Sequence, residues 1–224
     1  MDELPLIALG ALFVAVACAF IIMVDLLTGN KQKMWIMNIV WPVSALYLGP
    51  FGLLAYFTIG RKNSAKHTRQ SHMGHKKPFW QSAFVATLHC GSGCTLGNII
   101  AELLISIVPV FVWGSNILGA WVVDFVFAFL LGIIFQYYTI KPMKKLSAKQ
   151  GLIAALKVDT LSLIFWQIGM YGWMAIATFI IFNHDLRKDA LVFCFMMQIA
   201  MLFGLLTSYG INWWLLKKGI KEVM

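Results

Sequence analysis

The chain consists of long apolar segments that follow one another with only short polar connections between them. Of its 224 residues, 60% are hydrophobic and 12% are charged, whereas a soluble domain has about 25% charged residues. A membrane-spanning helix needs roughly 20 mostly apolar residues, and backbone groups in lipid must be hydrogen-bonded within a helix or a closed barrel. Because the apolar runs are continuous, they predict an all-α polytopic membrane helix bundle.

About six segments are long and apolar enough to be transmembrane helices. Pro42 and the pair Gly49-Pro50 predict a kink near the middle of the second segment. The third segment is too long for one straight crossing, so it either protrudes or tilts, or breaks at Gly91-Ser92-Gly93. The segments form a single transmembrane domain over residues 1–224, with spans at residues 4–28, 35–59, 79–113, 117–140, 160–182 and 190–216.

The positions of Lys and Arg predict the orientation of the chain. With six spans and a cytoplasmic N-terminus, 14 of the 18 Lys and Arg residues fall on the cytoplasmic side and four on the other. The positive-inside rule therefore predicts that both termini are cytoplasmic. Membrane topology thus explains the net charge of +9, so we expect the lipid bilayer as a partner and no nucleic acid.

His89, Cys90 and Cys94 form the most distinctive local motif, inside the third segment. Cys90 and Cys94 are four residues apart, which places both thiols on one face of a continuous helix. Thiolate and imidazole are ligands for Cu(I) and Zn(II), so the motif predicts a metal site. The same thiols could instead form a redox-active pair. In a third interpretation the cysteines are small packing residues, and Gly93 and Gly97 mark a close contact between helices.

Two pairs of methionines share a helix face in the last two segments. Met170 and Met174 are four residues apart, as are Met197 and Met201. Thioether ligands favour Cu(I), so we predict that these four residues extend the metal site. Methionine is also an ordinary filler of apolar cores, which is the alternative interpretation.

Glu102 and Asp124 are the acidic residues that lie deepest in the apolar segments. Charged groups at this depth are costly, so we expect both to face the bundle interior, either as links between helices or as functional groups. Counted along the helices, they share a layer near the outer ends with the four methionines. We also expect Cys90 and Cys94 to face the interior, nearer the cytoplasm.

These residues predict an integral membrane protein that handles a soft metal ion, most simply Cu(I), by transport or delivery, with copper as the expected cofactor. One alternative is a membrane thiol–disulfide oxidoreductase that uses Cys90 and Cys94. Another is a proton-coupled small-solute transporter or an assembly scaffold, in which Glu102 and Asp124 would matter. The sequence has no Walker loop, so we expect no ATP-driven pump, and it leaves open whether the protein is an enzyme.

Two long segments and several shorter ones carry recognisable motifs. The long ones are residues 88–97 (LHCGSGCTLG) and residues 207–222 (TSYGINWWLLKKGIKE). From about residue 78 to residue 224, the chain resembles the domain-of-unknown-function 4396 family of prokaryotic polytopic membrane proteins. Asn98 and Gly210 depart from its pattern, which has Asp and Pro there. The resemblance names no activity, but it implies a multi-pass protein of the prokaryotic cell membrane and a copper-binding, cupredoxin-like protein as partner.

Overall fold

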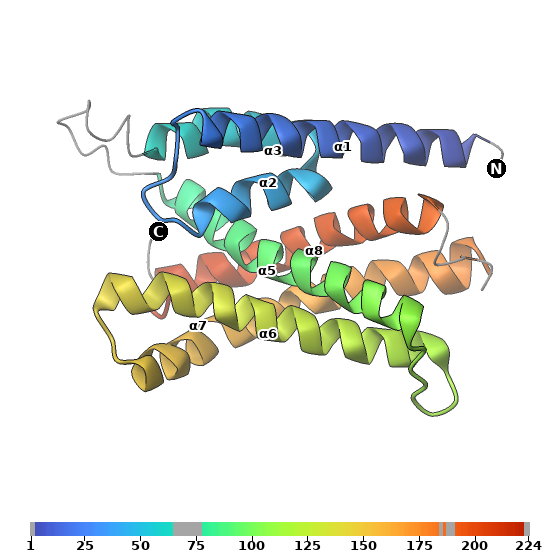
Figure 1. The fold of residues 1–224 in the computed structure, drawn as a ribbon. Helices are drawn as coiled ribbons and strands as arrows, with labels where there is room; N and C mark the ends of the chain where they lie inside the picture. Colours follow the sequence, from blue (N-terminus) through green and yellow to red (C-terminus); the bar gives the residue numbers. More distant parts are fainter. Residues whose placement is uncertain (1–2, 65–77, 184–185, 187–190, 222–224) are drawn as a thin grey trace.

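The computed structural model describes residues 3–64, 78–183, 186 and 191–221, and these residues form an all-α bundle (Figure 1). Five of its helices are long and apolar enough to cross a membrane. The predicted all-α membrane bundle is therefore confirmed. The five helices are α1 (Leu4–Leu27), α5 (Phe79–Ile107), α6 (Asn116–Lys144), α7 (Ala148–Ala175), which continues as a π-helical segment (Ile176–Ile181), and α8 (Leu191–Lys217).

The second predicted span is a helical hairpin and not a crossing. Its first arm, α2 (Met37–Leu48), has 12 residues and reaches about 18 Å, little more than half of a ~30 Å hydrocarbon core. The chain then reverses at Gly49, whose φ of 55° and ψ of −129° favour glycine. Pro50 begins the return arm, which comprises α3 (Pro50–Ala55) and a π-helical turn (Tyr56–Gly60).

Contacts between the two arms explain why the chain reverses at Gly49 and does not merely kink. The rings of Trp41 and Tyr56 pack edge to face with their centroids 5.7 Å apart. Gly60 lies so close to Trp41 that a Cβ there would be 2.6 Å from the indole. The backbones of Gln32 and Ser64, which flank the hairpin, form an isolated antiparallel bridge. The hairpin therefore begins and ends at one end of the bundle.

This hairpin changes the topology, because the chain then runs the length of the bundle five times. The start of α1 and the end of α8 lie at opposite ends (Figure 1), so the prediction that both termini lie on one side does not hold. We call the end of the bundle at which α8 ends the basic end. Every described Lys and Arg lies there or within three turns of it: Lys31, Lys33, Arg61, Lys62, Lys141, Lys144, Lys145, Lys149, Lys157, Lys217, Lys218 and Lys221.

The other helix boundaries differ from the predicted spans in two places. Helix α5 is continuous through Gly91-Ser92-Gly93 and ends at Ile107, which excludes a break, one of the two alternatives considered, and shortens the third segment. Helix α7 begins at Ala148, about three turns before the predicted span, because Ser147 and Gln150 form a capping box. Six predicted loop residues, Lys66, Arg69, Lys76, Lys77, Arg187 and Lys188, lie outside the described part of the chain.

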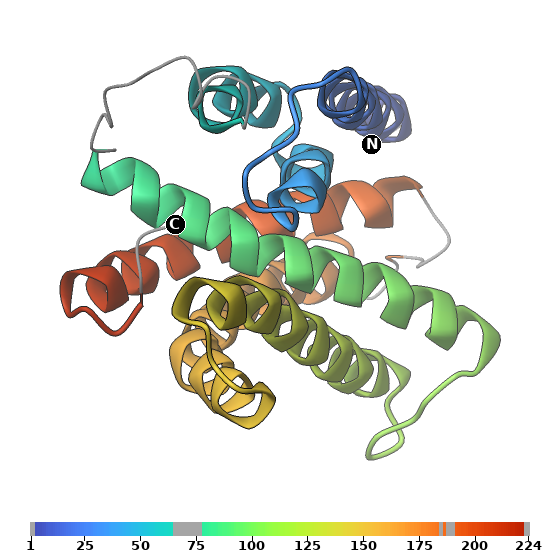
Figure 2. The same cartoon turned by 60° about the vertical axis from the view of Figure 1, so that its left-hand side comes forward.

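Helix α5 is the centre of the bundle and packs most closely on α6. Figure 2 shows α5 between the group of α1, α2 and α3 on one side and the pair of α6 and α7 on the other. A Cβ on Gly97 would lie 2.5 Å from the Cα of Ala128, and one on Gly93 would lie 2.8 Å from the Cα of Gly132. The close helix contact predicted at Gly93 and Gly97 is therefore present, and it brings the backbones of α5 and α6 together.

Labelling of cysteines introduced one at a time tests the hairpin topology. Lys33, Lys218 and Trp113 are exposed, and each would be changed to Cys in a chain whose exposed Cys194 is Ser. We expect a membrane-impermeant thiol reagent to label K33C and K218C from the same face and W113C from the other. Labelling of K33C and K218C from opposite faces would restore the six-span topology and contradict the hairpin.

The substitution Gly97→Ala tests the contact between α5 and α6. The added methyl group would overlap the Ala128 backbone, and overpacking of this kind costs about 1–3 kcal/mol. We expect a lower melting temperature in detergent. Gly172→Ala in α7 is the matched control, because a Cβ there meets nothing within 4 Å and alanine favours helix by up to about 1 kcal/mol. Equal melting temperatures for the two variants would contradict the contact.

Candidate functional site

Cys90 and Cys94 lie in the interior of the bundle on one face of α5. Both are 0% exposed, and neither forms a disulfide. They are one turn apart on a continuous helix and belong to one apolar cluster with Met201 and Trp166. Cys90 is in the half of α5 nearer the basic end, and Cys94 is at the middle. The prediction that both thiols face the interior is confirmed.

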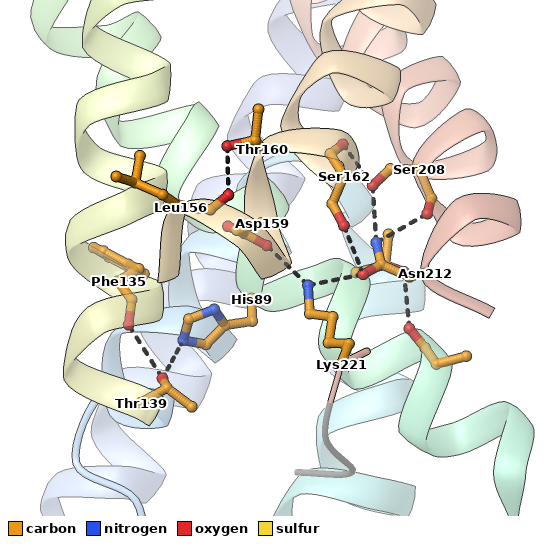
Figure 3. A network of polar contacts seen from close by, with 12 residues as sticks. His89, Phe135, Thr139, Leu156, Asp159, Thr160, Ser162, Ser208, Asn212 and Lys221 are labelled. Carbon is orange, nitrogen blue, oxygen red and sulfur yellow. Dashed lines mark hydrogen bonds and ion pairs between the residues drawn. The ribbon is translucent and has the colours of Figure 1, made fainter. Parts of the chain in front are cut away.

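His89 is buried beside the thiols in sequence but faces α6. Its Nε2 lies 2.7 Å from the Oγ1 of Thr139, and that hydroxyl donates to the carbonyl of Phe135 at 3.1 Å (Figure 3). Which of the two atoms donates depends on the tautomer of the imidazole. Within the described residues, no three side chains of His, Cys, Asp or Glu come together as a metal-binding group. The structure therefore does not bring His89, Cys90 and Cys94 together as one set of ligands.

Two methionine sulfurs contact polar side chains of α5 on the side of Cys94 away from the basic end. The Oγ1 of Thr95, which donates to the carbonyl of Gly91 at 2.8 Å, lies 3.6 Å from the Sδ of Met201. Asn98 donates from Nδ2 to the Sδ of Met170 at 3.0 Å. Both methionines are buried, so they are part of the interior and do not face lipid.

Glu102 and Asp124 meet in a small cavity one turn further along α5. The cavity has a volume of about 50 Å³, and Met174 and Met197 also line it. This space is enough for one or two water molecules or an ion. Met197 also packs against both the cluster that contains the thiols and the cluster that contains Met170 and Met174. Both carboxylates and two of the four methionines of the predicted layer thus line one cavity, whereas Met170 and Met201 do not line it.

A larger cavity of about 760 Å³ lies beyond the tip of the helical hairpin. Thr95, Asn98, Glu102 and Ser106 form a polar stripe along its α5 wall, at spacings of about one helical turn. The rest of the lining includes apolar residues of α1, Leu46 of the hairpin, and Met197 and Met201 of α8. Because the hairpin reverses part of the way through the bundle, no helix in the described part of the chain fills this space, and Glu102 borders both cavities.

Sequence reasoning missed a buried ion pair near the basic end. The Nζ of Lys221 lies 2.8 Å from the Oδ1 of Asp159 in α7 and 2.8 Å from the Oδ1 of Asn212 in α8 (Figure 3). The side chains of Lys221 and Asp159 are both 0% exposed. The network is extended by Ser162, which donates to the Oδ1 of Asn212 at 3.0 Å, and by Asn212, which donates to the carbonyl of Ser208 at 2.9 Å.

The fold and this interior define a class: a helical membrane bundle whose core carries thiols, thioethers and a buried ion pair. Residues 79–221 match the family described as Domain of unknown function (DUF4396), and the chain therefore belongs to that family. The match contains helices α5 to α8 and Lys221, and it leaves α1 and the hairpin outside. Searches of curated proteins and of solved structures find no match.

Proposed function

We propose that the protein carries Cu(I) through the bundle, by transport across the membrane or by delivery to a partner. One observation carries this proposal: sulfur-containing side chains of α5, α7 and α8, all buried except the partly buried Met197, lie at successive levels of α5. We call this series the sulfur path. It starts at Cys90 and Cys94, continues with Met201 beside Thr95 and Met170 beside Asn98, and ends at Met174 and Met197 beside Glu102 and Asp124.

The order of ligands along the sulfur path suits the chemistry of Cu(I). Thioethers are soft, neutral ligands that select Cu(I) over harder cations, and thiolates are stronger soft ligands. The carboxylates of Glu102 and Asp124 would attract a cation into the small cavity. From there Met174 and Met197 would pass it to Met170 and Met201, and then to the thiols. His89 would support the helix contact through Thr139 and would not be a ligand.

Charge distribution supports an orientation for this path. In the hairpin topology, Lys31 and Lys33 join the other described basic residues at one end, and no described Lys or Arg lies at the other. The positive-inside rule then favours a multi-pass protein of the prokaryotic cell membrane with its basic end in the cytoplasm and its N-terminus outside. The thiols would lie nearer the cytoplasm, where a copper-binding protein could accept the ion.

The 760 Å³ cavity favours a second candidate function, a proton-coupled transporter of a small solute. Its volume is far larger than a single ion needs and lies in the range of about 300–1,000 Å³ that is typical of small-molecule sites. Glu102 borders this cavity and would be the proton-carrying group. A thiol–disulfide oxidoreductase has less support, because Cys90 and Cys94 are both fully buried and have no visible route to a redox partner.

Metal retention tests the copper proposal. Purified protein would be loaded with Cu(I), separated from excess metal and measured by elemental analysis. We expect the wild type to retain copper and the variant with Cys90→Ser and Cys94→Ser to lose most of it, because Ser offers a hard ligand in place of a soft one. Cys18→Ser is the matched control, since Cys18 is also buried but lies in α1.

Two outcomes would contradict the copper proposal. One is a wild-type protein that retains no copper while both thiols are free. The other is equal copper retention by the wild type and the double variant, which would place the metal elsewhere. If copper is absent and Glu102→Gln abolishes a proton-dependent solute uptake, the second candidate function is favoured.

A further inference from the structure

The tail after α8 turns back and places Lys221 inside the bundle. Gly219 has a φ of 69°, a conformation that glycine adopts easily. The backbone N–H groups of Ile220 and Lys221 both donate to the carbonyl of Leu215, at 3.0 and 3.2 Å. This turn reverses the chain at the end of the helix and directs Lys221 toward Asp159 and away from water.

Stability alone does not account for the burial of this ion pair. A buried pair is often no more stabilising than apolar residues of the same size, although removal of one partner is costly. Lys217 and Lys218 in the same tail are exposed, so the surface is within reach of this part of the chain. Lysine side chains readily extend toward water when they can. Lys221 therefore occupies an interior position that it could leave.

The carboxylate of Asp159 has unused hydrogen-bonding capacity on the side away from Lys221. Its Oδ2 is buried and has no partner among the described residues, and the same holds for the Nδ1 of His89. One and two turns after Asp159 on α7, Leu163 and Trp166 belong to the same buried cluster as Cys90 and Cys94. Figure 3 shows the ion pair beside His89, the residue that precedes Cys90 on α5.

We propose that Lys221 is a latch that closes the thiol end of the interior against the basic face. With the ammonium bound to Asp159 and Asn212, the thiols are sealed. When the tail withdraws Lys221, the oxygens of Asp159 and Asn212 and the thiols behind them open to that face. A cation that leaves the thiols toward this face passes the same oxygens, so it competes with the ammonium for them.

This inference rests on the proposed copper path for its purpose, but the accessibility of the thiols can be measured without metal. A chain with Cys18→Ser and Cys194→Ser keeps only Cys90 and Cys94. It would be placed in membrane vesicles in which a C-terminal tag is accessible from outside. The labelling rate of the thiols by a charged, membrane-impermeant thiosulfonate then reports access from the basic face.

Lys221→Met removes the charge of the latch and keeps a long side chain. We expect labelling to become about tenfold faster or more, since a factor of ten corresponds to only ~1.4 kcal/mol and breaking a buried ion pair costs more than that. Lys218→Met is the matched control on the exposed side of the same tail and should leave the rate unchanged. Unchanged labelling in folded K221M would overturn the latch.

A paired variant covers the case in which Lys221→Met alone misfolds, because it leaves the Asp159 charge buried without its partner. Asp159→Asn with Lys221→Met removes both charges and the desolvation cost with them. We expect it to fold, as judged by its melting temperature, and to label as fast as K221M. A paired variant that folds but is labelled slowly would overturn the latch. Failure of both variants to fold would also overturn it, because the ion pair would then be required for folding. Neither outcome would change the copper retention of the wild type, which is measured separately.

Discussion

The close contact of α5 with α6 determines where the buried polar groups of the core lie. The two helices are antiparallel, and Gly93 faces Gly132 while Gly97 faces Ala128. One turn beyond Gly97, this register brings Glu102 to the level of Asp124, and both line one cavity. On the other side of Gly93, it brings His89 to Thr139 at 2.7 Å. A side chain at either glycine would force the backbones apart and separate both pairs.

The half-length hairpin and the basic end give the two halves of the bundle different properties. At the basic end, α2, α3, α5 and α8 fill the space, and Lys221 is held by Asp159 and Asn212. Beyond the hairpin tip there is a cavity of about 760 Å³ with a polar stripe on α5. The half of the bundle at the basic end is therefore closed and carries charged residues near its surface. The other half contains an open cavity lined by thioethers and a carboxylate. This asymmetry is the physical basis for the direction of the proposed path.

Much of the core could be predicted from the sequence because it follows from helix geometry. The four-residue spacing of Cys90 and Cys94 fixes their shared face, and counting residues outward from the turn at Gly114 puts Glu102 and Asp124 at similar depth. His89 illustrates a limit of reasoning from sequence neighbours. Adjacent helix residues point about 100° apart, so the imidazole next to Cys90 contacts Thr139 of α6 and does not share the face of the thiols.

The hairpin and the ion pair could not be predicted because they depend on contacts between distant residues. The second apolar segment is long enough to span a membrane, and Gly49-Pro50 is compatible with either a kink or a reversal. Packing of Trp41 against Tyr56 and Gly60 decides for the reversal. Lys221 resembles any basic residue of a cytoplasmic tail, and its partners lie 62 and nine residues away in sequence.

The central claim is that sulfur atoms in the interior bind Cu(I), and X-ray absorption spectroscopy of the copper-loaded protein tests it most directly. The spectrum reports the oxidation state of the metal and the elements bonded to it. The account predicts Cu(I) with sulfur ligands alone, supplied by Cys90 and Cys94 or by the methionines that follow them. Copper bound mainly to nitrogen or oxygen would place the ion outside the sulfur path and would contradict the claim.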